Sequence, residues 1–211
     1  AISCAGSTPV SLLATNLTFN AGTSTITCSA TSSTFAGGGL TYYNVSFTNT
    51  GTSNTTITGA NTFNNLTQSS TTSAIRLVVF SANQTVTGTL TLGAANTAVL
   101  RVVVRTDAVG TQRTLTVATI ATLADVDFQD IVAAGASGTW SGTRLGNCTN
   151  NSNITFGAGK TVYWNLAGAQ NWNATGWAAS SGASPAVNNF PLAQDTAVFD
   201  GTGAVTGIIT I

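Results

Sequence analysis

Short runs of strand-forming residues recur along the chain and constrain its fold more than any other feature. Each run is dense in Thr, Val, Ile, Leu or Phe, and Gly, Asn or Ser separates it from the next. Val, Ile, Phe and Thr fit the pleated surface of a β-sheet, whereas Gly and Asn favour turns. No segment shows the 3.6-residue period of an amphipathic helix, and the helix formers Glu and Met are absent. We therefore predict an all-β protein.

The predicted strands share this composition and are bounded by turn residues. They are Leu17–Phe19, Ser24–Ser29, Leu40–Thr48, Thr55–Thr58, Phe63–Thr67, Ile75–Phe80, Gln84–Leu92, Ala98–Arg105, Thr114–Ile120, Ala124–Ile131, Asn153–Phe156, Thr161–Asn165, Ala197–Asp200 and Val205–Ile211.

Two of these segments show a shared pattern that favours a repeat architecture. Tyr43–Asn49 aligns with Ala124–Asp130, with Val and Phe at matching places. The offset of roughly 80 residues fits three to four coils of a β-solenoid, whose repeats are about 20 to 30 residues long. In such a stack Val and Phe point inward, while Asn, Thr and Ser point outward. A β-sandwich, in which the strands follow one another at intervals of about 8 to 12 residues, is the alternative.

Three of the four tryptophans lie in a segment of different amino-acid composition. Trp164, Trp172 and Trp177 alternate there with Asn, Gln, Gly and Ala. Aromatic rings bury large areas, so this irregular segment can hold its shape by docking on the solenoid wall. We predict solenoid coils over 1–160, a docked Trp/Asn-rich excursion over 161–196, and returning strands over 197–211 that could begin a further module.

Several motifs also carry a resemblance. They are Tyr163–Asn165, Asn171–Asn173, Trp177, Pro191 and Asp195–Asp200, preceded by Leu145–Cys148, Ile154–Phe156, Phe35–Phe47 and Asn61–Leu66. The chain resembles β-strand-repeat proteins of tailed-phage virions and of bacterial surface or autotransporter-like proteins. This resemblance implies a right-handed parallel β-helix on a particle or cell surface, often in tandem modules, and it implies no catalytic residues.

Charge is scarce and balanced, which excludes several functions. Lys and Arg number 6 against 6 acidic residues, all of them Asp, and His is absent. Six scattered cations form no basic stripe for nucleic acid or acidic lipid. No apolar run approaches the roughly 20 residues of a membrane-spanning helix. Without His, most hydrolase and metalloenzyme templates lack their residues. We therefore expect no enzyme, no cofactor, no nucleic-acid partner and no membrane insertion.

Asp125, Asp127 and Asp130 are the candidates for chemistry. On one strand, Asp125 and Asp127 would lie on the same face about 6.6 Å apart, near the lower bound for an inverting glycosidase. The three carboxylates together could also hold calcium. Asn44 and Ser46 occupy the matching places of the aligned segment, as a merely polar strand face would show. Arg144 and Lys160 are isolated cations and define no site.

Two further features leave alternatives open. Trp164, Trp172 and Trp177 lie beside amide side chains, as in sugar-binding grooves, but they could equally form the small core of their own segment. Cys4 and Cys28 lie about one coil apart along the sequence. They could form a disulfide in an extracellular protein or remain buried thiols. Three cysteines without a CxxC pair indicate no zinc site.

We expect a structural module of an extracellular or virion surface fibre, such as a phage tail fibre or decoration protein. Open solenoid ends expose unpaired strand edges, so copies of the chain or adjacent modules are the expected partners, in an oligomer or filament. A secreted bacterial adhesin that binds host surface glycans is the alternative. A polysaccharide depolymerase using Asp125 and Asp127 is the third hypothesis.

Overall fold

The computed structural model describes residues 1–48, 54–68, 75–93, 98–202 and 207–210. The chain forms two compact units: unit 1 is Ala1–Asn96 with Leu100–Phe156, and unit 2 is Gly157–Ile211 with Thr97–Val99. Strands and loops make up both units, which confirms the predicted all-β class. The last strands belong to the same unit as the Trp-rich segment, so 161–196 and 197–211 are not separate parts. None of the described residues forms a helix long and apolar enough to cross a membrane.

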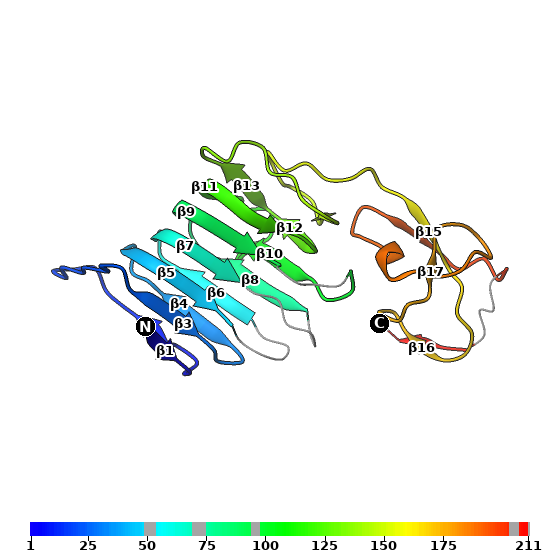
Figure 1. Cartoon of the computed structure of the whole chain (residues 1–211), viewed down its shortest axis with the longest axis horizontal. Helices are drawn as coiled ribbons and strands as arrows, with labels where there is room; N and C mark the ends of the chain where they lie inside the picture. The colour runs from blue at the N-terminus through cyan, green and yellow to red at the C-terminus, as the bar shows by residue number, and fades with distance from the viewer. Residues whose placement is uncertain (49–53, 69–74, 94–97, 203–206, 211) are drawn as a thin grey trace. The chain divides into compact units, whose positions relative to one another are not determined.

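Unit 1 contains two seven-stranded sheets, and consecutive strands alternate between them (Figure 1). The first sheet has the order β1 (Ile2–Cys4), β3 (Thr25–Cys28), β5 (Thr41–Phe47), β7 (Thr62–Gln68), β9 (Gln84–Leu92), β11 (Arg113–Leu123) and β13 (Ile131–Ala134). The second has the order β14 (Gly146–Asn147), β12 (Val126–Gln129), β10 (Val102–Thr106), β8 (Arg76–Phe80), β6 (Asn54–Thr58), β4 (Ser33–Ala36) and β2 (Val10–Ser11). All pairings between these named strands are parallel, unlike the antiparallel ladders of a β-sandwich.

The distance along the chain from one strand to its partner varies. Ile26 on β3 pairs with Val45 on β5, and Leu90 on β9 pairs with Ile120 on β11. The step along the chain from Leu90 to Ile120 is much longer than the step from Ile26 to Val45. This variation explains why the predicted repeat alignment fails. Its two segments fall in different sheets, one on β5 and the other on β12. The matching pattern therefore reflects a shared inside-outside alternation, not equivalent positions in the stack.

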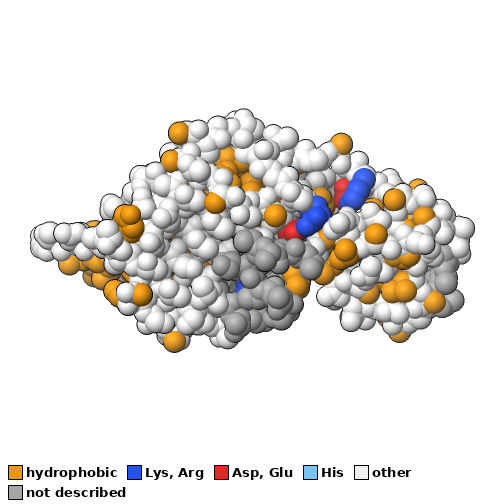
Figure 2. All heavy atoms as spheres, in the orientation of Figure 1, with side chains coloured by type: hydrophobic (Ala, Val, Ile, Leu, Met, Phe, Trp, Pro, Cys, Tyr) orange, Lys and Arg blue, Asp and Glu red, His pale blue; other side chains and the backbone are white. Residues whose placement is uncertain are grey.

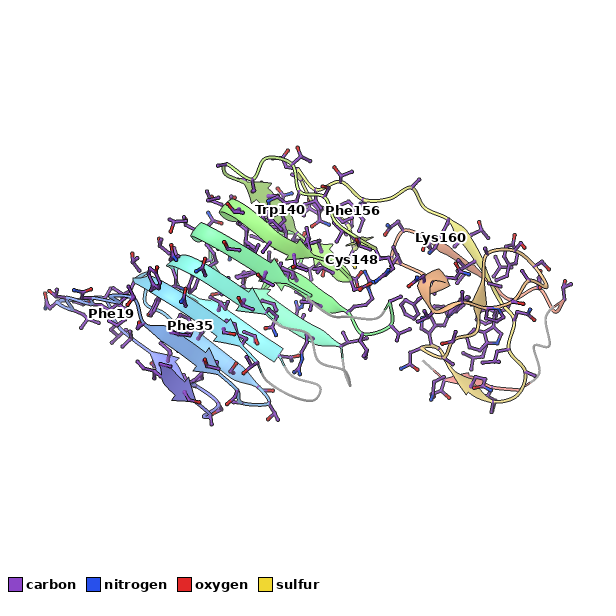
Figure 3. The ribbon with its side chains drawn as sticks, in the orientation of Figure 1. Phe19, Phe35, Trp140, Cys148, Phe156 and Lys160 are labelled. Carbon is purple, nitrogen blue, oxygen red and sulfur yellow. The ribbon has the colours of Figure 1, made fainter. Side chains whose placement is uncertain are left out.

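Inward-facing apolar side chains from both sheets form one core in unit 1. Phe35 lies 4.9 Å from Tyr42 and 5.8 Å from Phe63, measured between ring centroids. Phe128 packs against Trp140 and Phe156 in the same way, at 6.0 and 6.5 Å. Figure 3 labels Phe35 near the N-terminal strands and Trp140 and Phe156 near the last strands of the unit. Aromatic pairs thus reinforce both ends of the core.

Several predicted strand boundaries are wrong. Leu17–Phe19 is not a strand, and Asn153–Phe156 contributes one isolated bridge, from Ile154 to Trp140. The predicted strand Ala124–Ile131 is broken at Asp130, whose φ of 61° turns the chain from one sheet to the other. Short strands such as β4 were missed because four residues give too little periodicity to detect.

Unit 2 has shorter strands and a small core of its own. β15 (Thr161–Trp164) pairs antiparallel with β17 (Trp177–Ala178) and parallel with β18 (Thr196–Val198). β16 (Gln170–Asn171) pairs with β19 (Ile209–Thr210), and η1 (Val187–Asn189) is a short 3-10 helix. The predicted strands Thr161–Asn165 and Ala197–Asp200 overlap β15 and β18. The predicted strand Val205–Ile211 contains β19, and both of its ends lie outside the described residues.

Candidate functional site

Two of the candidate aspartates lie in a buried ionic cluster with Arg101 and Arg144. Arg101 directly precedes β10, and Asp127 lies on the neighbouring strand β12. Asp125 lies outside the strand, at a corner with a φ of 56°. The side chains of Arg101 and Asp125 are 4% and 1% exposed. The prediction that Asp125 and Asp127 share one strand face is therefore wrong, because the chain turns between the two sheets at Asp125.

Each carboxylate is paired with a guanidinium group through both oxygens. Arg101 donates from Nε and Nη2 to the two oxygens of Asp127, both at 2.7 Å. Arg144 donates from Nε and Nη2 to the two oxygens of Asp125, at 2.6 and 2.8 Å. Arg101 also donates to the Arg144 carbonyl oxygen at 2.7 Å, and its Nη1 lies 3.6 Å from Asp125 Oδ1. The hydrogen bond to Asp125 raises the pKa of Arg144, which keeps this guanidinium group charged.

This pairing determines what the cluster can do chemically. Bidentate arginine contacts occupy the oxygens that a general acid, a general base or a calcium ligand would use. Asp130 lies apart from the cluster, accepting from Asn150 Nδ2 at 2.5 Å and from the Gly110 amide at 3.0 Å. Among the described residues, no three His, Cys, Asp or Glu side chains come close enough to hold a metal ion. The cluster therefore serves to hold adjacent coils together.

The expectation that Arg144 is an isolated cation is wrong, and the arginine partners of Asp125 and Asp127 were not predicted. Arg101 precedes Asp125 by the same offset that separates Cys4 from Cys28, so a coil-length argument could have found this pair. Arg144 follows Asp125 at a shorter offset, and the irregular coil length hid this second pairing. Gly146 also belongs to this site, and only the structure explains why a glycine stands there. A Cβ atom at this position would collide with the Asp127 carboxylate.

The tryptophans of unit 2 pack mainly against one another. The ring centroids of Trp164 and Trp172 lie 5.1 and 4.7 Å from that of Trp177, and Phe199 lies 5.5 Å from it. The indole N–H of Trp164 donates to the Leu166 carbonyl, and that of Trp177 donates to the Trp172 carbonyl. Trp164 and Trp177 are each 1% exposed. Their faces are not open to a sugar, so a glycan would have to use Trp172 and Phe199, which are the more exposed rings.

Cys4 and Cys28 are register partners on β1 and β3, and both are free thiols. The offset of one coil is thus confirmed, while the disulfide stays a prediction. Burial, with a smaller contribution from Cys4, raises the pKa of Cys28 to about 12. A thiol with such a pKa is almost wholly protonated at neutral pH and is a poor nucleophile.

The N-terminal end of unit 1 carries an apolar groove. β1 and β2 are the outermost strands of the two sheets at this end, so within the described part of the chain each has an edge without a strand partner. A hollow of 450 Å³ opens here, lined by Ile2, Cys4, Pro9, Val10, Ser11, Leu12, Phe19, Asn20, Ala21, Ser24 and Ile26. Ile2 is 55% exposed. This end therefore combines apolar side chains with open strand edges.

Lys160 and Asp195 form the main polar anchor of unit 2. Asp195 accepts hydrogen bonds from the Lys160 side chain, from the Lys160 amide at 3.0 Å and from the Leu192 amide at 2.8 Å. Burial alone would raise the pKa of Asp195, but these hydrogen bonds lower it below its ordinary value. The carboxylate therefore stabilises unit 2 above the unfolded-state pKa of about 3.9, and this contribution is lost as pH falls through the lower folded-state pKa.

We expect the stability of unit 2 to fall at acid pH, and we call this part of its pH profile the acid limb. The urea midpoint, followed by the fluorescence of its three tryptophans, should be steady near neutrality and fall below about pH 4. Asp195→Asn should lower the midpoint at neutral pH and flatten this limb. Asp107→Asn, which removes the exposed partner of Arg113 in unit 1, is the matched control. An acid limb of equal depth in Asp195→Asn and the unmodified chain would contradict the assignment.

No family model matches the chain, and no curated protein or solved structure matches it either.

Proposed function

We propose that the chain is a structural module of an extracellular or virion surface fibre, built as a right-handed parallel β-helix. The alternation of consecutive strands between two parallel sheets is the observation that carries this proposal. Each circuit of the chain adds one strand to each sheet, so the stack can lengthen without changing its cross-section. A stiff rod of this kind suits a mechanical role.

The distribution of charge supports a mechanical role over a catalytic one. The buried Asp125 and the partly buried Asp127 are each paired with an arginine, so they act as clamps between coils. The surface in view in Figure 2 is mostly neutral, with few Lys, Arg or Asp side chains. Weak surface charge lowers the repulsion between copies and favours assembly. The sequence resemblance to virion and bacterial surface proteins gives the proposed location.

The N-terminal groove supports the proposed partner, which is a neighbouring module or a second copy of the chain. An open strand edge can pair with another strand, and the apolar residues around Ile2 can be buried in the same contact. We therefore expect end-to-end association. The scattering mass should rise with protein concentration, because the contact joins separate chains.

The test compares two charge substitutions in unit 1. Ile2→Lys places a cation in the groove, where burial in the contact would be costly. Val109→Lys places the same cation at a position outside the groove that is at least as exposed. Light scattering should show association in the unmodified chain and in Val109→Lys, and weaker association in Ile2→Lys. A species that stays monomeric at all concentrations would refute end-to-end assembly.

A glycan-binding adhesin is the second candidate, carried only by the partly exposed rings of Trp172 and Phe199. Glycan-array binding that is lost in Trp172→Ala, without loss of the unit 2 fold, would support it. A blank array would leave the structural role as the better account.

A further inference from the structure

Two parallel columns of small polar side chains run along the outer face of the first sheet. Register pairing places one hydroxyl from each of β1, β3, β5, β7, β9 and β11 in the first column: Ser3, Thr27, Ser46, Thr67, Thr91 and Thr122. The second column, two residues earlier on most strands, contains Thr25, Asn44, Asn65, Thr89 and Thr119. We call this surface the hydroxyl face.

The hydroxyl column persists where the strand geometry would break it. The pairing of β9 with β11 shifts register between Ile120 and Thr122, so that β11 has one extra residue. Thr122, and not Ala121, continues the column opposite Thr91. The described residues of the second sheet form no such column. Its row that starts at Thr34 continues through Thr56, Val79, Arg105 and Gln129. Strand propensity for Thr therefore does not account for the hydroxyl face.

The hydroxyl face is neutral and partly fixed in place. β3, β5, β7 and β9 contain no Asp, Glu, Lys or Arg. Asn44 Nδ2 donates to Thr25 Oγ1 at 3.2 Å, and Asn65 Nδ2 donates to Asn44 Oδ1 at 2.8 Å. The Thr89 amide donates to Asn65 Oδ1 at 2.9 Å. These hydrogen bonds already restrict the side chains of the column. Binding a ligand would therefore cost less side-chain entropy.

Water is the ligand whose hydrogen-bonding groups fit this surface. A trough of 390 Å³ lies along the face, lined by Thr25, Asn44, Val45, Ser46, Asn65, Thr67, Thr89 and Thr91. It has room for roughly a dozen waters at the ~30 Å³ that each occupies in the liquid. Neighbouring strands are ~4.8 Å apart and alternate residues along a strand ~6.7 Å apart. Crystal planes of ice present rows of oxygen atoms with comparable repeats in two directions.

We propose that the hydroxyl face binds ice. The hydroxyl and amide groups hold water in the trough in rows that match the crystal, and the growing lattice incorporates these rows. A sugar polymer fits less well, because neither column contains an aromatic ring for stacking. The aromatic rings of β5 and β7 are buried, apart from that of Tyr43 beside the columns. This proposal does not depend on end-to-end assembly, so either can fail alone.

The test measures ice growth in the presence of three forms of the full chain. Thr67→Tyr places a bulky ring in the centre of the hydroxyl face. Thr56→Tyr makes the same change at an outward, half-buried position on the second sheet and is the matched control. The melting temperature and far-ultraviolet circular dichroism establish that each form is folded. Thermal hysteresis and inhibition of ice recrystallisation are then measured at equal concentrations.

We expect the unmodified chain and Thr56→Tyr to depress the freezing point below the melting point and to keep ice crystals small. Thr67→Tyr should fall to the value of buffer alone while remaining folded. Absence of both effects in the unmodified chain would overturn the proposal. Equal activity in Thr67→Tyr, or equal loss in both variants, would overturn it as well. If Thr67→Tyr lost self-association while no form of the chain affected ice, the hydroxyl face would be assigned to contacts between copies instead.

Discussion

Arg101→Ala should destabilise unit 1 by about 3–5 kcal/mol, the usual cost of removing one partner from a buried ion pair. The substitution leaves the Asp127 carboxylate, which is 13% exposed, without its bidentate partner. It also removes the contact to Asp125 and the hydrogen bond to the Arg144 carbonyl. Arg101 is the residue that joins its own segment to the segments of Asp127 and Arg144, and the substitution removes this connection. The free energy of unfolding in urea, followed by far-ultraviolet circular dichroism, gives the measurement.

Arg113→Ala is the matched control for this prediction. Arg113 pairs with Asp107 at 3.2 Å, but both side chains are partly exposed, at 27% and 42%. Exposed pairs contribute at most about 1 kcal/mol, because water screens the charges and the side chains lose entropy. Similar losses of stability in the two variants would mean that the buried cluster does not clamp the coils as inferred.

Phe35→Ala should destabilise unit 1 by a similar amount, about 3–5 kcal/mol, because it removes a buried ring and leaves a cavity. Phe35 is fully buried and packs edge-on against Tyr42 and Phe47 and at a tilt against Phe63. These rings come from both sheets, so that the loss affects the contact between the sheets. The urea midpoint should fall without a change in the β-type circular dichroism of the folded state.

Leu13→Ala serves as the control for the core substitution. Leu13 is 84% exposed and lies outside the named strands. A surface change of this kind should alter stability by no more than about 0.5 kcal/mol. If Phe35→Ala behaved like Leu13→Ala, the two sheets would not share the core described above.

The sequence was informative where local pattern decides the structure. Alternation of apolar and polar residues located β5, β7 and β9 closely, because one side chain in two faces the core. On β7, Leu66 faces the core between Asn65 and Thr67, as alternation predicts. Phe63 is also buried although it lies two residues before Asn65, because the pairing of β7 with β9 is irregular between Phe63 and Leu66. Alternation alone does not predict this irregularity.

Long-range pairing was harder to predict, because coil length varies. The link from Arg144 to Asp125 spans a shorter stretch of chain than the link from Arg101 to Asp125. No single coil length predicts both of these ion pairs. The corner at Asp125 has a positive φ, which sequence pattern alone does not reveal for an aspartate. Whether Trp164 and Trp177 are buried or exposed also depends on which rings meet in space.

Electron microscopy of native material that contains this chain is the decisive measurement for the proposed surface fibre. We expect a regular fibre or particle surface in which the chain forms a parallel β-helical module. We also expect a neighbouring module in contact with the strand edges at β1 and β2. A freely diffusing single-chain monomer in the native material, with no neighbour at that end, would rule out the fibre role.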